Sequence, residues 1–362
     1  MISVEKYIYA FLLFSISTIN AQKIADTLQV EQLIPEKKAS YLLPNGHAPI
    51  GVMSDHMHKK GEFMFSYRFM YMAMDGMLNG SNDASNEDIL ARGFIVTPEK
   101  MNMQMHMIGA MYAPSDFVTI ALMGNILAND MDLVVIPPNR KFNTKSGGFG
   151  DLKLNALIKL LHEKDHHIHA NLGISFPTGN IEQRDDIPVK ENALLAYPMQ
   201  LGSGTFDPTF GATYTGKNSN LSWGAQSLFT FRINDNDRDY KLGPKGEATT
   251  WLAFRASNQF SFSARLSYVQ TGSIEGEDSE FAELLNMPNI PQRNLMPLFN
   301  NRNSGRKQLD ANIGTNFIVQ SSSLKGLRIG LEVGLPVYQD VNGFQMKNSW
   351  MGTVGIQYAI GR

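Results

Sequence analysis

The sequence contains no cysteine, which excludes a disulfide framework, a thiolate zinc site, an iron–sulfur cluster and a cysteine nucleophile. Charged residues are also scarce, at 18% of 362 residues, against roughly 25% in ordinary soluble domains. Positive charge is not in excess, because 32 Lys and Arg stand against 34 Asp and Glu. Binding of a nucleic-acid backbone requires such an excess, so no nucleic-acid partner is expected.

Long apolar runs are missing as well. No stretch beyond the N-terminus approaches 18 uninterrupted apolar residues, which excludes a bundle of membrane-spanning helices. Residues 1–21 contain Lys6, a short apolar run and a small residue, Ala21, in the layout of a secretory signal peptide. We therefore expect cleavage after Ala21 and a periplasmic, secreted or outer-membrane protein.

What the sequence does contain is alternation of apolar and polar side chains, the pattern of strands with two different faces. It is clear in residues 152–160, LKLNALIKL, and in residues 327–335, LRIGLEVGL. Strands are expected near residues 62–74, 101–113, 117–130, 148–161, 166–177, 204–215, 220–232, 247–256, 259–270, 308–319, 326–337 and 348–360.

The gaps between these segments alternate between long and short. An outer-membrane barrel has this pattern, with short periplasmic turns and long extracellular loops. We therefore predict an all-β fold, a transmembrane antiparallel β-barrel of about 12 strands over residues 62–362. Residues 22–61 are expected to form a periplasmic segment that could enter the lumen as a plug. A soluble all-β protein is the alternative.

In such a barrel apolar residues face lipid and polar residues face the lumen, so position parity assigns the faces. The predicted lipid-facing residues include Phe63, Phe65, Tyr67, Phe69, Tyr71, Phe260, Phe262, Leu266, Tyr268, Trp350, Val354, Ile356 and Tyr358. The predicted luminal charges are Arg68, Asp151, Lys153, Lys159, Arg232, Arg265, Asp310, Arg328 and Glu332. Charges of both signs indicate either a wetted lumen or ion pairs that link the strands.

Methionine is common, with 20 residues that concentrate between Met53 and Met131. On the strand expected at 101–113, parity predicts that the methionines Met101, Met103, Met105, Met107 and Met111 contact lipid. The candidate luminal residues are Met64, Arg68, Met70, Met72, Met74, His106, Met123, His167 and His169. Luminal methionines could line a path for apolar solutes, form a path for a soft metal, or pack against a plug.

Five stretches carry a family resemblance: HAPIGVMSDHMHKKGEFMFSYRFMYM (47–72), VTPEKMNMQMHMIGAMYAPSD (96–116), TKSGGFGDLKL (144–154), YPMQLGSGTFDPTFGATYTG (197–216) and GLEVGLPVYQD (330–340). Together they resemble bacterial outer-membrane transporters of the meta-pathway phenol-degradation type. The resemblance implies a barrel for uptake of aromatic or other hydrophobic compounds, without a set of catalytic residues. Outer-membrane lipid, lipopolysaccharide and the barrel-assembly machinery are the expected partners.

Possible ligands for a metal precede the first expected strand: His47, Met53, His56, Met57 and His58. Imidazole and thioether groups suit copper, so a copper site is one hypothesis for this segment. The spacing matches no known closed site, and a structural lead-in to the barrel is the alternative. No other cofactor is expected.

The sequence predicts no enzyme. Residues 162–166, HEKDH, match the zincin pattern, but that chemistry requires a helix and these residues fall in a short turn. No G-x-S-x-G motif is present. The preferred function is passage of small hydrophobic or aromatic solutes across the bacterial outer membrane. A copper-handling barrel and a non-conducting structural barrel are the alternatives.

Overall fold

The computed structural model describes residues 43–360, except for 137, 189, 286–294 and 322. The expected signal peptide at 1–21 and residues 22–42 of the expected periplasmic segment lie outside the described residues. None of the helices in the described ranges has the length and apolar character needed to span a bilayer.

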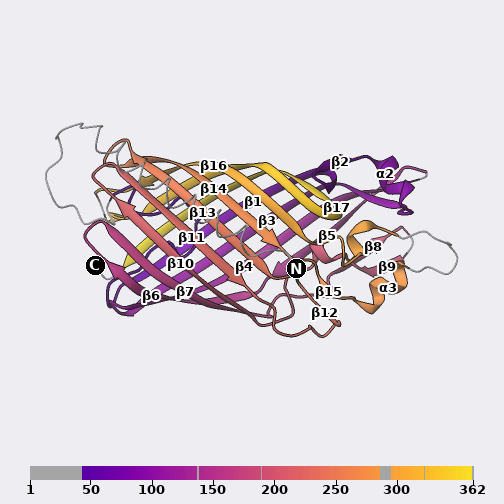
Figure 1. The fold of residues 1–362 in the computed structure, drawn as a ribbon, viewed down its shortest axis with the longest axis horizontal. Coiled ribbons are helices and arrows are strands. Elements are labelled where there is room, and N and C mark those ends of the chain that lie inside the picture. The colour runs from indigo at the N-terminus through magenta and orange to yellow at the C-terminus, as the bar shows by residue number, and fades with distance from the viewer. Residues whose placement is uncertain (1–42, 137, 189, 286–294, 322, 361–362) are drawn as a thin grey trace, which may run out of the picture. The chain divides into compact units, whose positions relative to one another are not determined.

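The described chain consists almost entirely of strands (Figure 1). The strands are β1 (Phe63–Gly80), β2 (Asn82–Ala84), β3 (Val96–Ser115), β4 (Val118–Val135), β5 (Arg140–Phe149), β6 (Leu152–His162), β7 (His166–Phe176), β8 (Arg184–Ile187), β9 (Lys190–Leu194), β10 (Asp207–Lys217), β11 (Leu221–Thr230), β12 (Tyr240–Lys241), β13 (Lys245–Arg255), β14 (Phe260–Thr271), β15 (Glu275–Gly276), β16 (Arg306–Ile318) and β17 (Arg328–Ile360). The helices are α2 (Asn86–Ala91), α3 (Ser279–Leu285) and the short 3-10 turns η2 (Tyr197–Met199) and η3 (Pro297–Phe299).

Eleven strands form a closed antiparallel ring in the order β17, β16, β14, β13, β11, β10, β7, β6, β4, β3 and β1. Pairing of β1 with β17 closes the ring, while β2 and β5 pair outside it. Closure leaves no edge in the ring, so the backbone groups of the wall can pair with one another even in lipid. The predicted transmembrane barrel is therefore confirmed.

The 33-residue strand β17 crosses the wall twice. Its first part pairs with β16, from Arg328 to Val341, and its second part pairs with β1 and ends at Ile360 opposite Phe63. The reversal falls at Asn342 and Gly343, where Gly343 has a positive φ of 64°. Asn-Gly is a favoured pair for a tight hairpin. With this reversal the ring has twelve passes, as expected, but a tight turn stands where a long gap was predicted.

Short turns connect alternate strands at one end of the barrel, and their side chains satisfy the exposed backbone. Ser115 Oγ accepts hydrogen bonds from the backbone N of Phe117 and Val118, at 3.3 and 3.2 Å. Asn218 Oδ1 does the same for Asn220 and Leu221, at 3.1 and 2.8 Å. Such local bonds favour Ser and Asn in turns. We call this end the short-turn end and the opposite end, which carries β2, α2, β8, β9 and α3, the long-loop end (Figure 1).

The outer face carries the predicted apolar belt. Phe65, Phe262 and Ile356 are exposed large apolar side chains of the wall. On β1 the belt runs from Phe63 to Tyr71, nine residues of a tilted strand, which corresponds to roughly 20 Å of height. This matches the apolar band of a transmembrane barrel. Above it, β1, β3 and β4 continue toward the long-loop end with exposed charges such as Asp75 and Lys100.

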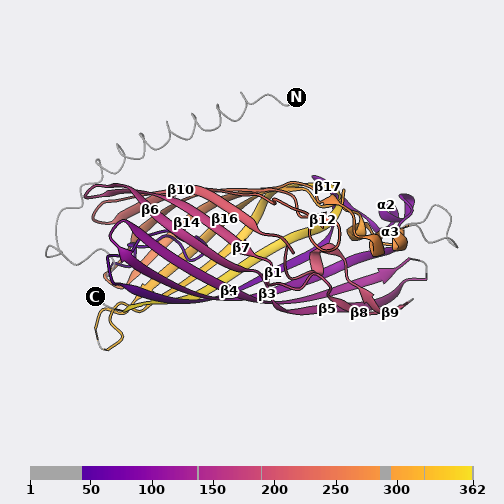
Figure 2. The same ribbon diagram turned by 90° about the horizontal axis from the view of Figure 1, so that it is seen from below.

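The wall divides where β4 leaves β6. The lower half of β4 pairs with β6, and its upper half, from Ile126 to Val135, pairs with β5 instead. Strand β7 ends opposite Leu152, so among the described strands β5 has no ring partner on its far side. Side chains cover that edge: Asp185 Oδ2 accepts from Lys145 N at 2.7 Å, and Gln183 Oε1 accepts from Gly147 N at 3.3 Å. Figure 2 shows β5, β8 and β9 together at the edge of the long-loop end.

Candidate functional site

One side of the lumen is built from methionine. β1 and β3 place Met64 opposite Met111, Met70 opposite Met105, Met72 opposite Met103 and Met74 opposite Met101. Cross-strand partners share a face, and the outer face here belongs to pairs such as Tyr67 and Ile108. We define the methionine wall as Met64, Met70, Met72, Met74, Met101, Met103, Met105, Met107, Met111, Met123, Met131 and Met351.

This arrangement corrects the predicted face of the second expected strand. Its methionines were expected to contact lipid, but Met101 and Met111 are buried and the whole row faces the lumen. His106 was expected in the lumen, and that prediction is wrong. It lies on the outer face, opposite Phe69, where its Nδ1 is 2.8 Å from the hydroxyl of Tyr67.

The opposite side of the lumen is ionic. Arg265 donates two hydrogen bonds to Glu332, at 3.0 and 2.6 Å, and both side chains are almost fully buried. Arg232 lies 3.2 Å from Asp207 on the same side. The lumen therefore has one apolar, flexible wall and one wall of paired charges.

Residues 44–58, which we call the inner segment, pass between these two walls. Four of its backbone carbonyls form hydrogen bonds with side chains of the wall. Arg328 donates to the carbonyl of Ala48, and Arg68 donates to that of Val52. Gln226 donates to the carbonyl of Met53, and His169 bonds that of Ser54. Two further bonds join it to the wall, from Ser261 Oγ to the carbonyl of Pro44 and from the backbone N of His58 to Thr119 Oγ1. Most of these wall residues lie near the short-turn ends of their strands, so the segment occupies that half of the lumen.

The fit is close at Gly51. A Cβ atom there would lie 2.1 Å from Glu332 Oε1 and 2.6 Å from Arg265 Nη2. Ile50 is similarly tight against Gly330 and Gly355 of β17. Only residues without a side chain allow the segment and the wall to approach this closely.

The long-loop end is closed by a hydrophobic cluster. It joins the upper ends of β3, β4 and β17 to the loops, and its members include Phe94, Met131, Tyr197, Phe281 and Phe299. A small apolar cavity of about 50 Å³ lies within it, lined by residues such as Val96, Met131, Leu195 and Met296. Met131 belongs both to this lining and to the methionine wall, so the two apolar surfaces are continuous.

A network of ion pairs holds the loops over this cluster. Arg184 binds Glu280 through two bonds of 3.0 and 2.7 Å, and Lys190 reaches the same carboxylate at 3.0 Å. Hydrogen bonds from Arg184, followed by those from Lys190, lower the pKa of Glu280 to about 2. Arg238 pairs with Asp278 next to it, and burial raises the pKa of the adjacent Tyr197 to about 12.

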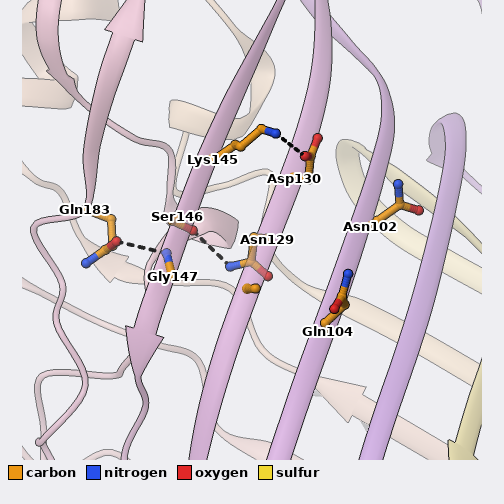
Figure 3. A pocket seen from close by; sticks show the side chains of 9 residues that line it. Asn102, Gln104, Asn129, Asp130, Lys145, Ser146, Gly147 and Gln183 are labelled. Atoms are coloured by element: carbon orange, nitrogen blue, oxygen red, sulfur yellow. Dashed lines mark hydrogen bonds and ion pairs between the residues drawn. The ribbon is translucent and has the colours of Figure 1, made fainter.

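A polar cavity of about 390 Å³ lies between the upper parts of β3, β4 and β5 (Figure 3). Lys145 reaches Asp130 at 2.9 Å, and Asn129 donates to Ser146 at 3.1 Å. Asn102 and Gln104 line the same cavity from β3. These polar groups lie above the apolar belt on that side of the wall.

The five predicted metal ligands are only partly brought together. His47 and His56 meet, with 3.3 Å between their Nδ1 atoms. Met53 instead contacts Arg68, and Met57 packs against the cluster that includes Met64 and Met111. His58 lies 3.4 Å from Glu62, with its ring centroid 4.8 Å from that of His56. Asp55, absent from the predicted set, joins the two imidazoles. Its place beside His56 in the sequence was the only available signal.

Two predicted luminal histidines also have defined positions. His169 is buried and bonds the carbonyl of Ser54 at 3.0 Å. His167 lies beside His162, with ring centroids 4.3 Å apart, at the short-turn end. The HEKDH sequence thus forms a turn between β6 and β7, as expected, rather than a helix.

Residues 81–331 match the family described as "Putative MetA-pathway of phenol degradation". No curated protein matches the chain. Among solved structures, the chain is similar to the COG4313 outer membrane channel from Pseudomonas putida F1, with a TM-score of 0.58, 13% identity, and coverage of 86% of this chain and 100% of that one.

More distant likenesses include the transport unit of the autotransporter AIDA-I from Escherichia coli, with a TM-score of 0.46, 10% identity, and coverage of 88% and 95% of the two chains. A Pseudomonas aeruginosa FadL homologue has a TM-score of 0.38 and 9% identity, with coverage of 82% of this chain and 89% of that one. These two likenesses are too distant to support an argument. The fold is that of an outer-membrane β-barrel, which confirms the architecture and location predicted from the sequence.

Proposed function

Because the chain belongs to this phenol-degradation family, we propose that its barrel passes small hydrophobic or aromatic solutes across the outer membrane. The observation that carries the proposal is the methionine wall, which runs from the apolar cavity at Met131 to Met64 and Met111 near the inner segment. Thioether side chains are flexible and polarizable, so they can adapt to solutes of different shape.

The opposite wall restricts which solutes fit this lumen. Paired charges such as Arg265 and Glu332 offer hydrogen bonds on one side, while on the methionine side Arg68 is already bonded to the inner segment. A solute with one apolar face and one polar group would satisfy both walls, and an aromatic carboxylate or phenol has that character. The proposed substrate class is therefore small amphipathic aromatics rather than sugars.

We further propose that passage is gated. The inner segment occupies the short-turn half of the lumen, and the loop cluster covers the other end, with an apolar cavity of about 50 Å³ within it. Passage would require movement of the loops and of the inner segment, which would then act as a plug.

No catalytic role is proposed for the chain, and its partners would be those of a channel. The exposed amines of Lys100, Lys141 and Lys145 lie above the apolar belt, where lipopolysaccharide phosphates would be found. Insertion would depend on the barrel-assembly machinery, as for other barrels of this class.

Solute flux into liposomes that contain the purified barrel tests this function. The solutes are a labelled aromatic carboxylate, whose charge limits its unaided passage through lipid, and a sugar of similar size. The double variant Met72→Gln and Met103→Gln keeps side-chain length but makes the wall polar. We expect aromatic flux to fall about tenfold, because two half-buried side chains of the wall lose their apolar character.

The matched control is Met72→Leu with Met103→Leu, which keeps the wall apolar and should keep the flux. Equal aromatic flux in the Gln and Leu variants would contradict the role of the wall. Wild-type barrels that pass neither solute would favour the structural, non-conducting alternative.

A further inference from the structure

The inner segment carries a cluster of ligand groups that solute passage does not explain. The ring nitrogens of His47 and His56 and a carboxylate oxygen of Asp55 all lie within 4.8 Å of one another. We propose that these three side chains bind one divalent transition-metal ion, Cu²⁺ or Zn²⁺, inside the barrel.

The distances suit a shared ion. Two ligand atoms at about 2.0 Å from one tetrahedral metal are about 3.3 Å apart. The two Nδ1 atoms are 3.3 Å apart, and Asp55 Oδ1 lies 2.9 Å from that of His56. His47 Nδ1 lies 3.9 Å from the other carboxylate oxygen, Asp55 Oδ2, so the carboxylate faces both imidazoles. Three protein ligands leave a fourth position open for water or another ligand.

The ligand types restrict the metal. Two imidazoles and one carboxylate suit Cu²⁺ and Zn²⁺ rather than Mg²⁺ or Ca²⁺, which prefer oxygen ligands. The thioethers of Met53 and Met57 point elsewhere in the fold, so the set is not one for Cu(I). The guanidinium groups of Arg68 and Arg328 bond the same segment and oppose a cation. The repulsion is the same for both ions, and imidazole nitrogens bind Cu²⁺ more tightly than Zn²⁺, so Cu²⁺ is expected to have the higher affinity here.

Without metal, hydrogen bonds can hold the cluster together. The Nδ1 atom of His56 is within hydrogen-bond distance of Asp55 Oδ1 and of His47 Nδ1, with roles that depend on the tautomers of the two rings. The metal-free cluster is therefore itself held by hydrogen bonds, and the experiment must distinguish this metal-free arrangement from the metal-bound one. Asp55 Oδ2 also accepts from Ala48 N at 2.9 Å, which holds the carboxylate in place in either case.

A bound ion would join the two ends of the turn from His47 to His56. This turn contains Gly51 and Val52, which contact the ion pair and Arg68 of the wall. Metal binding would therefore fix the shape of the inner segment. This goes beyond the proposed solute passage, because the site is occupied whether or not the barrel conducts.

The test is metal binding by the full-length barrel in detergent after chelator treatment. CuCl₂ and ZnCl₂ are titrated separately, bound metal is measured by elemental analysis after desalting, and Cu²⁺ nitrogen coordination is read by electron paramagnetic resonance. We expect one ion per chain, two coordinated nitrogens, and at least a tenfold loss of affinity in His47→Ala and His56→Ala.

His167→Ala is the matched control, because it removes a histidine from the separate pair with His162 and should leave binding unchanged. A heat-dependent gel shift reports whether the alanine variants fold. If they do not, Asp55→Asn replaces them in the test, because it keeps the shape of the carboxylate and should still weaken metal binding. No bound ion in the wild type, equal affinity in the folded His56→Ala variant, or loss of binding in His167→Ala would each overturn the proposal.

Discussion

One pair of charged residues inside the barrel is held together by direct hydrogen bonds. Arg265 on β14 and Glu332 on β17 are bound through two hydrogen bonds and are nearly inaccessible to solvent. Burial of one such charge alone is costly, because the lost hydration is not replaced. The pair also borders Gly51, so its geometry sets the space left for the inner segment.

Removal of one partner should therefore destabilise the barrel strongly. For Arg265→Ala we expect a loss of 3–5 kcal/mol in the free energy of unfolding, roughly the cost of leaving a buried charge unpaired. Guanidinium unfolding in lipid vesicles, followed by tryptophan fluorescence, measures this loss.

The control is Lys307→Ala, since Lys307 lies 3.7 Å from Asp340 in a more exposed pair. Such pairs contribute about 1 kcal/mol or less. Similar losses in the two variants would show that the Arg265 pair is not insulated from solvent.

The sequence predicted the face of the wall correctly for some residues and wrongly for others. The charges at Arg68, Arg265, Arg328 and Glu332 were placed inside correctly, because a charge in a strand of apolar alternation has one tolerable face. His106 was misplaced, because an imidazole can also lie on the outer face when a neighbour such as Tyr67 bonds it. The contribution of Asp55 depends on a turn of the inner segment, which alternation does not encode.

At the scale of elements, the alternation located the strands but not always their faces. On β3 the odd positions are apolar and the even positions include Asn102 and Gln104, which normally indicates a luminal even face. The assignment fails because the lumen itself is lined by methionine and the upper part of β3 lies above the lipid belt. Its pairing with the aromatic row of β1 would have revealed the correct face.

The loops over the long-loop end depend on Glu280 in α3. Its folded pKa of about 2 lies below the ordinary value of 4.5. The carboxylate therefore stabilises the folded loops fully above pH 4.5, and this contribution is lost as pH falls toward 2.

We expect Glu280→Gln to loosen β8, β9 and α3 at neutral pH. Hydrogen exchange measured by mass spectrometry should be roughly tenfold faster there than in the wild type, because two charge-assisted bonds from Arg184 become weaker. The difference should diminish near pH 2, where the wild-type carboxyl is also becoming protonated. Glu283→Gln alters an exposed residue of the same helix and is the control; an equal effect there would contradict the role of Glu280.

At the scale of the molecule, the barrel combines two kinds of interior in one ring. The methionine wall occupies β1, β3, β4 and the second part of β17, whereas the two charge pairs come from β10, the residues just after β11, β14 and the first part of β17. The first part of β17 thus belongs to the charged side of the lumen and the second part to the methionine wall. Pairing of β1 with the second half completes the methionine wall at the point where the chain closes on itself.

That closure can be tested through its register. Met72 and Met351 are direct partners across the β1–β17 seam and face the lumen together. Directly opposed Cβ atoms in antiparallel strands are about 4.5–5.5 Å apart, close to the spacing that a disulfide needs. Because the chain has no cysteine of its own, the variant Met72→Cys with Met351→Cys contains a single candidate pair.

We expect this variant to form an internal disulfide on oxidation and to resist the heat-dependent shift of an unfolding barrel on a non-reducing gel. The comparison variant, Met72→Cys with Val354→Cys, places the second thiol on the opposite face of the wall, since Val354 pairs with the outward Phe69. It should not cross-link. Cross-linking of the second variant but not the first would mean that β17 is shifted by an odd number of residues, which would exchange its lipid and luminal faces and break the methionine wall at the seam.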